Sequence, residues 1–293
     1  MWAGFGGLVI GVRDLAAAEA AYAALLGLRP SWSALPTGDG CTSSGFALAN
    51  ALLELRAPSA EAAAARGLRE WILARGEGLC AIVLASDDVQ ASARRLGAVG
   101  IHGGGASPPA GSGAASPFAA ALRIPGSATR GIPVLVADSA SLPPRATPAD
   151  EASVAALDHV VVASRDLEAS RAVWGGTLGL RLALDRRFEA RGLRILFFRV
   201  AGVTVEITGP LDATATGDPL DSFFGVAWRV ADVSAARERV AAAGFDVSEV
   251  RAGHKPGTLV CTVRGGTCGV ATLLLGPARG ADPGPESATL RRS

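Results

Sequence analysis

Two stretches of this chain, GLVIGVRDLAAAEAAYAALLGLR at residues 7–29 and HVVVASRDLEASRAVWGGTLGLR at residues 159–181, repeat one pattern at an offset of 152. Each begins with an apolar run, reaches an Asp (Asp14 or Asp166), continues as an Ala-rich segment and ends in LGLR. An Asp at a helix start accepts hydrogen bonds from first-turn N–H groups, and a Gly suits the helix end. The repeat therefore predicts a strand followed by a helix in each half.

The same offset extends to LLELRAP at residues 52–58, where Glu54 aligns with Glu206. A weaker repeat aligns DDVQASARRLGAVGI from Asp87 with ADVSAARERVAAAGF from Ala231 at an offset of 144. Four units are thus expected, near residues 5–58, 79–140, 155–210 and 222–277. The third unit shows the order βαβββ, with a helix over 166–178 and strands near 181–186, 193–200 and 202–208.

Length and composition favour a globular protein with two domains. The chain has 293 residues, 49% hydrophobic and 19% charged, and its net charge is +1. That balance gives no general electrostatic attraction to nucleic acid or anionic membranes. No apolar run reaches the length of a membrane span, and neither a signal peptide nor a zinc-finger cysteine spacing is evident, so we expect a cytoplasmic protein.

The expected domain organisation follows from the repeat and from the linker composition. We predict an N-terminal domain at 1–140, a linker at 141–154, a C-terminal domain at 155–277 and a flexible tail at 278–293. The Gly/Ser/Pro-rich stretch 102–117 is expected to be a mobile loop inside the second unit, with His102 exposed.

Two motifs of the third unit, LDHVVVASRDL (157–167) and VEITGP (205–210), resemble the vicinal oxygen chelate superfamily. Its members include the glyoxalase I, fosfomycin and bleomycin resistance, and extradiol dioxygenase families. The resemblance implies an α+β fold in which four βαβββ units form two tandem half-open barrel domains. It also implies that the sheets curl into a cup that can hold one divalent metal ion and a small-molecule ligand.

The resemblance further implies where metal ligands lie, namely on the first and last strands of a unit. His159 and Glu206 occupy these positions and are the predicted metal ligands, with Glu206 also the predicted catalytic base. The third ligand is left open between Glu54 and His254. Zn²⁺, Fe²⁺, Mn²⁺, Co²⁺ or Ni²⁺ would suit such a mixed nitrogen and oxygen site. The ligand set is incomplete, because other residues stand at the matching positions of the other units: Gly7, Ala81, Gly225 and Leu273.

Strand alternation indicates which side chains face the cup. In AGVTVEITGP, Thr204 and Glu206 share one face, opposite the apolar residues that would pack against helices. Arg229 shares a face with small residues and could bind a carboxylate. The loop VRAGHKPGT (250–258) offers His254 and Lys255 to an anionic or carbonyl-bearing ligand. Thr204, Arg229, His254 and Lys255 are therefore the predicted substrate-binding residues.

Ordinary structural roles compete with these assignments. Arg56 lies two residues after Glu54 on the same face, which favours an ion pair between them. Glu206 could likewise pair with Arg194 on a neighbouring strand, and His159 could bond only to backbone. Asp14 and Asp166 are better explained as helix caps than as catalytic groups.

Three functions remain open on the sequence alone. The first is a divalent-metal-dependent lyase or isomerase that acts on a small oxygenated metabolite. The second is a metal-free protein that binds a small molecule, as in resistance by sequestration. In the third, the N-terminal half only supports the other half. Partners are expected to be small molecules, without nucleic acid or membrane, and a homodimer is left open.

Overall fold

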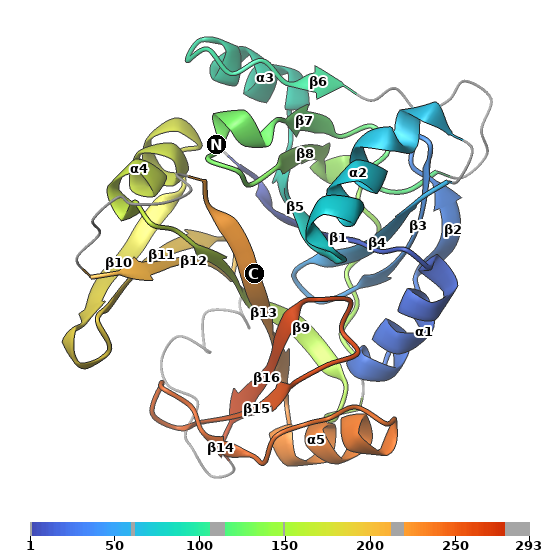
Figure 1. The fold of residues 1–293 in the computed structure, drawn as a ribbon, viewed down its shortest axis with the longest axis vertical. Helices are drawn as coiled ribbons and strands as arrows, with labels where there is room; N and C mark the ends of the chain where they lie inside the picture. The colour runs from blue at the N-terminus through green and yellow to red at the C-terminus, as the bar shows by residue number, and fades with distance from the viewer. Residues whose placement is uncertain (1, 60–61, 106–114, 149, 212–219, 279–293) are drawn as a thin grey trace.

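Two mixed eight-stranded sheets dominate the structure, a computed structural model that describes residues 2–59, 62–105, 115–148, 150–211 and 220–278 (Figure 1). The first sheet has the order β2-β3-β4-β1-β5-β8-β7-β6. Its strands are β1 (Gly4–Gly11), β2 (Trp32–Pro36), β3 (Cys41–Ala47), β4 (Leu52–Pro58), β5 (Gly78–Ser86), β6 (Gly104–Gly105), β7 (Leu122–Ile124) and β8 (Val134–Asp138).

The second sheet repeats this arrangement in the order β10-β11-β12-β9-β13-β16-β15-β14. Its strands are β9 (Val154–Ala163), β10 (Arg181–Phe188), β11 (Leu193–Val200), β12 (Val203–Pro210), β13 (Ser222–Val230), β14 (Arg251–Ala252), β15 (Thr258–Val263) and β16 (Ala271–Pro277). Each sheet therefore combines two successive units, which answers how the four units pair. The α+β architecture of two tandem curled sheets is confirmed.

Five α-helices accompany the sheets within the described part of the chain: α1 (Leu15–Leu26), α2 (Arg66–Arg75), α3 (Val89–Gly97), α4 (Leu167–Arg171) and α5 (Val233–Ala242). Asp14 and Asp166 accept hydrogen bonds from Ala17 N and Ala169 N, so both are helix caps as predicted. The helix expected over 166–178 is present, but its second half, residues 172–177, is π-helical instead of α-helical. Gly175 and Gly176 weaken the α-helix there.

The register of the repeat is preserved between the halves. In the first sheet Val9 of β1 pairs with Glu54 of the parallel strand β4. In the second sheet Val161 of β9 pairs with Glu206 of β12 in the same way. The two glutamates consequently occupy equivalent places on equivalent sheets.

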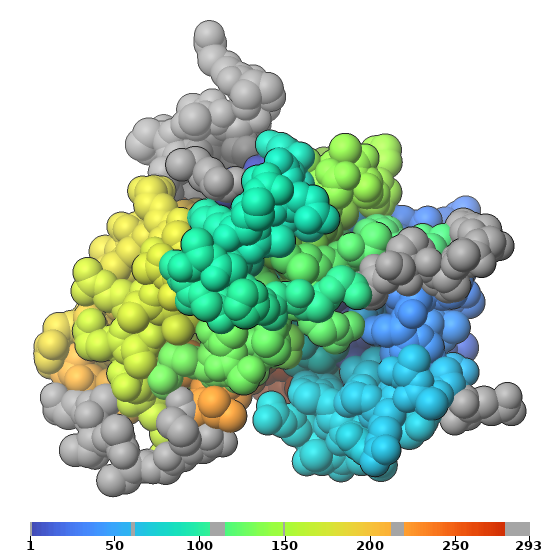
Figure 2. Space-filling model, turned by 90° about the horizontal axis from the view of Figure 1, so that it is seen from above, coloured from blue at the N-terminus to red at the C-terminus, as the bar shows by residue number. Residues whose placement is uncertain are grey.

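The two halves pack against each other through one continuous hydrophobic core that contains residues from both sheets. The Asn50 side chain binds the backbone of Leu157 twice, donating to its carbonyl at 2.7 Å and accepting from its N–H at 2.9 Å. The Tyr22 hydroxyl donates to the carbonyl of Thr267 at 3.0 Å. Figure 2 shows α3 and the rest of the second unit, in teal and green, between the yellow part of the C-terminal half and the blue first unit.

The predicted domain limits stay predictions, although β8 ends at Asp138 and β9 begins at Val154. Most of the expected mobile loop (106–114) and of the expected tail (279–293) lies outside the described residues. His102 is exposed, as expected. No helix in the described ranges is both long and apolar enough to cross a membrane.

Candidate functional site

His159 and Glu206 lie together on the concave face of the second sheet. They stand on the neighbouring parallel strands β9 and β12, and His159 Nδ1 is 3.7 Å from Glu206 Oε1. Both side chains are only partly accessible, at 18% and 19% exposure. Burial raises the pKa of Glu206, although the nearby His159 opposes the shift. The two predicted ligands therefore lie side by side, and burial disfavours the ionised form of the Glu206 carboxyl group.

Asp158 is the third member of this cluster, and the sequence analysis did not single it out. His159 Nδ1 and Asp158 Oδ2 form a hydrogen bond of 2.9 Å, and Arg229 Nη2 donates to Asp158 Oδ1 at 2.8 Å. Burial would raise the pKa of Asp158, but its bonds to His159 and Arg229 hold it well below its usual range. Asp158 therefore remains a carboxylate that fixes both basic side chains.

Asp158 escaped detection because strict strand alternation places it on the opposite face from His159. The pairing of β9 with β13 runs from Ala227–His159 directly to Trp228–Leu157, so Asp158 is the extra residue of a β-bulge. A bulge breaks the alternation and re-aims a side chain. Its signal in sequence is no more than a polar residue next to the histidine.

The other predicted binding residues differ in burial and in their distance from this cluster. Thr204 pairs in register with His159, and its side chain is buried, with 7% of the residue exposed. Arg229 is joined to the cluster by its ion pair with Asp158, and 39% of its side chain is exposed. His254 and Lys255 lie elsewhere, in the exposed turn between β14 and β15. His254 contacts Arg191, at 2.9 Å between Nε2 and Nη1.

A divalent ion fits this cluster as a two-ligand site if it is held through the other ring nitrogen. His159 Nδ1, the atom 3.7 Å from Glu206 Oε1, is already hydrogen-bonded to Asp158, so Nε2 of His159 and the carboxylate of Glu206 are the groups that would hold an ion. No further His, Cys, Asp or Glu in the described ranges completes a group of three that could hold a metal. Gly225 cannot simply be exchanged for a ligand, because a Cβ there would come within 2.3 Å of the Ala271 carbonyl oxygen.

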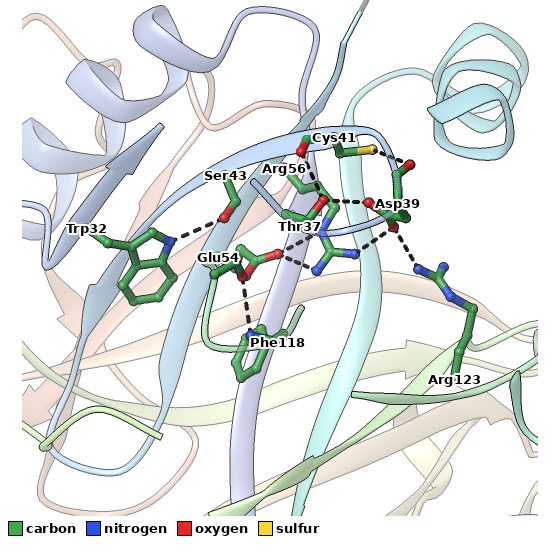
Figure 3. Close-up of polar contacts among 10 residues, drawn as sticks. Trp32, Thr37, Asp39, Cys41, Ser43, Glu54, Arg56, Phe118 and Arg123 are labelled. Carbon is green, nitrogen blue, oxygen red and sulfur yellow. Dashed lines mark hydrogen bonds and ion pairs between the residues drawn. The ribbon is translucent and has the colours of Figure 1, made fainter. Parts of the chain in front are cut away.

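The matching carboxylate of the first sheet, Glu54, is locked into a buried ion pair (Figure 3). Its Oε1 accepts from Arg56 Nε at 2.6 Å, and its Oε2 accepts a short hydrogen bond from Ser116 Oγ. Glu54 is fully buried, and Arg56 is 5% exposed. Both oxygens are thus engaged by residues of the N-terminal half, which leaves Glu54 without the role of a third ligand.

Further polar residues complete this buried cluster. Arg56 Nη1 and Arg123 Nη2 both donate to Asp39 Oδ2, at 3.2 and 2.9 Å, and the Thr37 hydroxyl donates to Asp39 Oδ1 at 2.5 Å. Burial would raise the pKa of Asp39, but Arg56 and Thr37 outweigh it and lower the pKa. The predicted Glu54–Arg56 pair is confirmed as the centre of a structural network.

The first cup is also filled by its own chain. Phe118 packs with Val9, Leu52, Ala81 and Val83 in a separate buried cluster on the concave face. A Cβ on Gly7, the counterpart of His159, would lie 3.0 Å from Phe118 Cζ and 2.3 Å from the Leu52 carbonyl oxygen. A histidine therefore does not fit at the position of Gly7.

The alternative pairing of Glu206 with Arg194 is wrong. Arg194 instead donates to Asp185 at 2.8 Å and to Glu168 at 2.6 Å. His159 lies 3.7 Å from Glu206, and the charge of Arg199 also acts to lower the Glu206 pKa. Among the residues that the structure describes, no arginine forms an ion pair with Glu206 of the kind that Arg56 forms with Glu54.

Comparisons with known proteins agree with this architecture. Residues 8–151 match a family described as a glyoxalase-like domain, and residues 158–262 match the glyoxalase, bleomycin resistance protein and dioxygenase superfamily. Ethylmalonyl-CoA/methylmalonyl-CoA epimerase of Cereibacter sphaeroides is 29% identical over 100 residues, which are 31% of this chain and 72% of that protein.

Solved structures resemble most or all of the chain, among them the following two. A variant of 4-hydroxymandelate synthase from Streptomyces coelicolor superposes with a TM-score of 0.70 at 17% identity, covering 99% of this chain and 97% of that one. A Mn(II)-bound glyoxalase from Novosphingobium aromaticivorans gives a TM-score of 0.64 at 17% identity, covering 94% and 82%. At this identity the likeness establishes the fold alone.

A tandem pair of curled βαβββ sheets, with both halves matched by glyoxalase-type families, defines the class. The chain belongs to the vicinal oxygen chelate superfamily and consists of two glyoxalase-like domains in tandem. The resemblance noted in its sequence is confirmed.

Proposed function

We propose that the protein is a lyase or isomerase that acts on a small oxygenated metabolite at the concave face of the second sheet. The observation that supports this most strongly is the pairing of His159 with Glu206, 3.7 Å apart, at the two positions where the superfamily places metal ligands. In this proposal His159 and Glu206 hold a divalent ion, and substrate oxygens or water supply its remaining ligands. The Mn(II)-bound glyoxalase shows that this fold can hold such an ion.

The proposed chemistry is proton transfer at a carbon next to a carbonyl. A divalent ion, when bound, supplies polarisation of the carbonyl oxygen, which makes the adjacent C–H more acidic. Glu206 accepts the proton when it acts as a base instead of a ligand, and burial, which raises its pKa, makes it a stronger base than an exposed glutamate. Glu206 then returns the proton to carbon in an isomerase, or a leaving group departs in a lyase.

The surrounding residues position these groups. Asp158 fixes the orientation of the His159 ring through Nδ1, and Arg229 holds Asp158 from the other side. Thr204 lies on β12 and pairs with His159 of β9, and its hydroxyl is proposed to contact substrate. Arg229 is proposed to bind a substrate carboxylate with the donors that Asp158 does not use.

A metal-free binding protein is the second candidate. It is favoured by the absence, among the described residues, of any group of three or more side chains that could hold a metal. In that case the partly buried cup would bind its ligand without catalysis, and a protonated Glu206 would lower the cost of burying the carboxyl group.

Metal content and solvent proton exchange together test the proposal. We expect about one divalent ion per chain after reconstitution with Mn²⁺, and its loss in Glu206→Gln and His159→Ala. Glu189→Gln, which changes an exposed glutamate, is the control. Incubation in D₂O with a panel of small 2-oxo and 2-hydroxy acids should then show deuterium incorporation that Glu206→Gln abolishes. Metal-free protein that binds members of the panel without exchange would favour the second candidate.

A further inference from the structure

Two hairpins from opposite edges of the second sheet contact each other. The strands β10 and β14 are the two outermost strands of that sheet. Yet Arg191, in the turn between β10 and β11, has its Nη1 2.9 Å from Nε2 of His254, in the turn between β14 and β15. Figure 1 shows both hairpins, yellow and orange, extending to the same lower-left side. The sheet is therefore curled enough for the hairpins at its two edges to come into contact.

The strand register places the two turns at opposite ends of the central strands. Leu193, two residues after Arg191, pairs with Pro210 of β12, at the Ala163 end of β9. Thr258 pairs with Pro277 of β16, which lies toward the Val154 end of β9 because β9 and β13 are antiparallel. The contact between the two turns therefore crosses the concave side of the curled sheet. Pro210 itself lies roughly 13 Å along β12 from Glu206.

The chemistry of this contact is unusual, because both side chains are basic. A guanidinium has donors only, so His254 Nε2 must accept from Arg191. In the described ranges, the contact recorded for each of these side chains is with the other, and neither forms an ion pair with a carboxylate. The nearby Glu189 forms an ion pair with Arg187, at 3.1 Å between Oε1 and Nε. Arg191 and His254 are both exposed residues.

We propose that Arg191 and His254 form an oxyanion receptor on the concave side of the second sheet. The molecule handled at Glu206 would then bear a carboxylate or a phosphate at a distance from its reacting end. An oxyanion between the two side chains would accept hydrogen bonds from both of them. The planar guanidinium of Arg191 is suited to contact two oxygen atoms at once. The statement about the molecule handled at Glu206 rests on the proposed function, because it defines the substrate class of that same site.

The chain has three histidines, which makes the receptor directly observable. We would follow the imidazole resonances of the metal-free protein by NMR while adding inorganic phosphate or acetate at constant ionic strength in KCl. The His254 resonance should shift and saturate, while those of His102 and His159 stay in place. A tighter response to one anion identifies whether phosphate or carboxylate is preferred.

Matched variants separate recognition from general electrostatics. Arg191→Gln should weaken the anion response of His254 by about tenfold or more, as expected for one lost charged hydrogen bond. Arg264→Gln removes the same charge from an exposed arginine that pairs with Asp246, and it should have no effect. A His254 resonance that ignores both anions, or responds equally in Arg191→Gln, would overturn the receptor.

The outcome is independent of the metal test. A His254 response in a protein that binds no metal would support the receptor and contradict only the metal part of the proposed function. Metal binding and proton exchange without a His254 response would contradict the receptor alone.

Discussion

Glu54 and Glu206 occupy the same place in the repeat and have opposite surroundings. Each pairs with a valine of the first strand, Val9 or Val161, in the same parallel register. Glu54 is fully buried and bound by Arg56, whereas Glu206 is partly exposed and faces His159 at 3.7 Å. One residue type in one register is therefore a structural anchor in the first half and a candidate reactive group in the second.

Replacement of the two glutamates by glutamine should have unequal effects on stability. Glu54→Gln leaves the buried Arg56 without its main counter-charge and should lower the free energy of unfolding by about 3–5 kcal/mol. Glu206→Gln removes a carboxylate whose ionisation burial disfavours, so the change should stay within about 1 kcal/mol. Urea unfolding of both variants at neutral pH measures the contrast. Equal losses would contradict the structural role assigned to Glu54.

The pKa of His159 should fall when Asp158 is replaced. Burial alone would lower this pKa, but the Asp158 hydrogen bond and the charge of Glu206 outweigh it and raise the pKa above 6.5. The imidazolium therefore contributes stability that is fully present below that value and is lost as pH rises through the folded pKa. Asp158→Asn should thus destabilise the metal-free protein more near about pH 6 than near about pH 9.

NMR titration of His159 measures the pKa directly, and unfolding at both pH values measures the linked stability. Asp246→Asn changes an exposed acid that pairs with Arg264 and serves as the control. A His159 pKa that is unchanged in Asp158→Asn would contradict the assigned hydrogen bond.

A third metal ligand should be difficult to add at Gly225. A Cβ there would lie 2.3 Å from the Ala271 carbonyl oxygen of the parallel strand β16. Even Gly225→Ala should therefore cost about 1–3 kcal/mol of stability, as overpacking does in other cores. Gly67→Ala, in α2 with open space around its Cβ, should instead be neutral or stabilise by up to about 1 kcal/mol. Thermal unfolding of the pair distinguishes a backbone clash from a general glycine effect.

The two halves should unfold together. They share one hydrophobic core, and Asn50 makes two hydrogen bonds to the backbone of Leu157 across the interface. Asn50→Ala leaves both backbone groups unsatisfied and should cost about 2–4 kcal/mol. Calorimetry should show one cooperative transition in the native chain. Two separate transitions in the unaltered protein would contradict a shared core.

Much of the fold could be predicted from the sequence, because the repeat restates each element. The 152-residue offset places β1 on β9, Asp14 on Asp166 and Glu54 on Glu206, and the structure repeats their pairing. The second unit was less predictable, since β6 and β7 have only 2 and 3 residues. Strands that short leave almost no alternation to detect.

The candidate site was predictable in its centre and not in its surroundings. His159 and Glu206 were implied by the family resemblance, but the place of Asp158 depends on a bulge and that of Arg191 on the curling of a whole sheet. Phe118, which fills the first cup, comes from a segment with no periodic pattern. Such long-range placements depend on tertiary packing, which local sequence does not record.

The covalent joining of two similar modules has a consequence for symmetry. In a dimer of identical subunits, every substitution appears twice, so a residue cannot be kept in one cup and changed in the other. Here the two copies lie on one chain and can differ. Gly7 and Phe118 are tightly packed in the first half, whereas the position of Gly7 is taken by His159, beside Glu206, in the second half. Substitutions can thus accumulate in one copy while the side chains of the other copy stay unchanged.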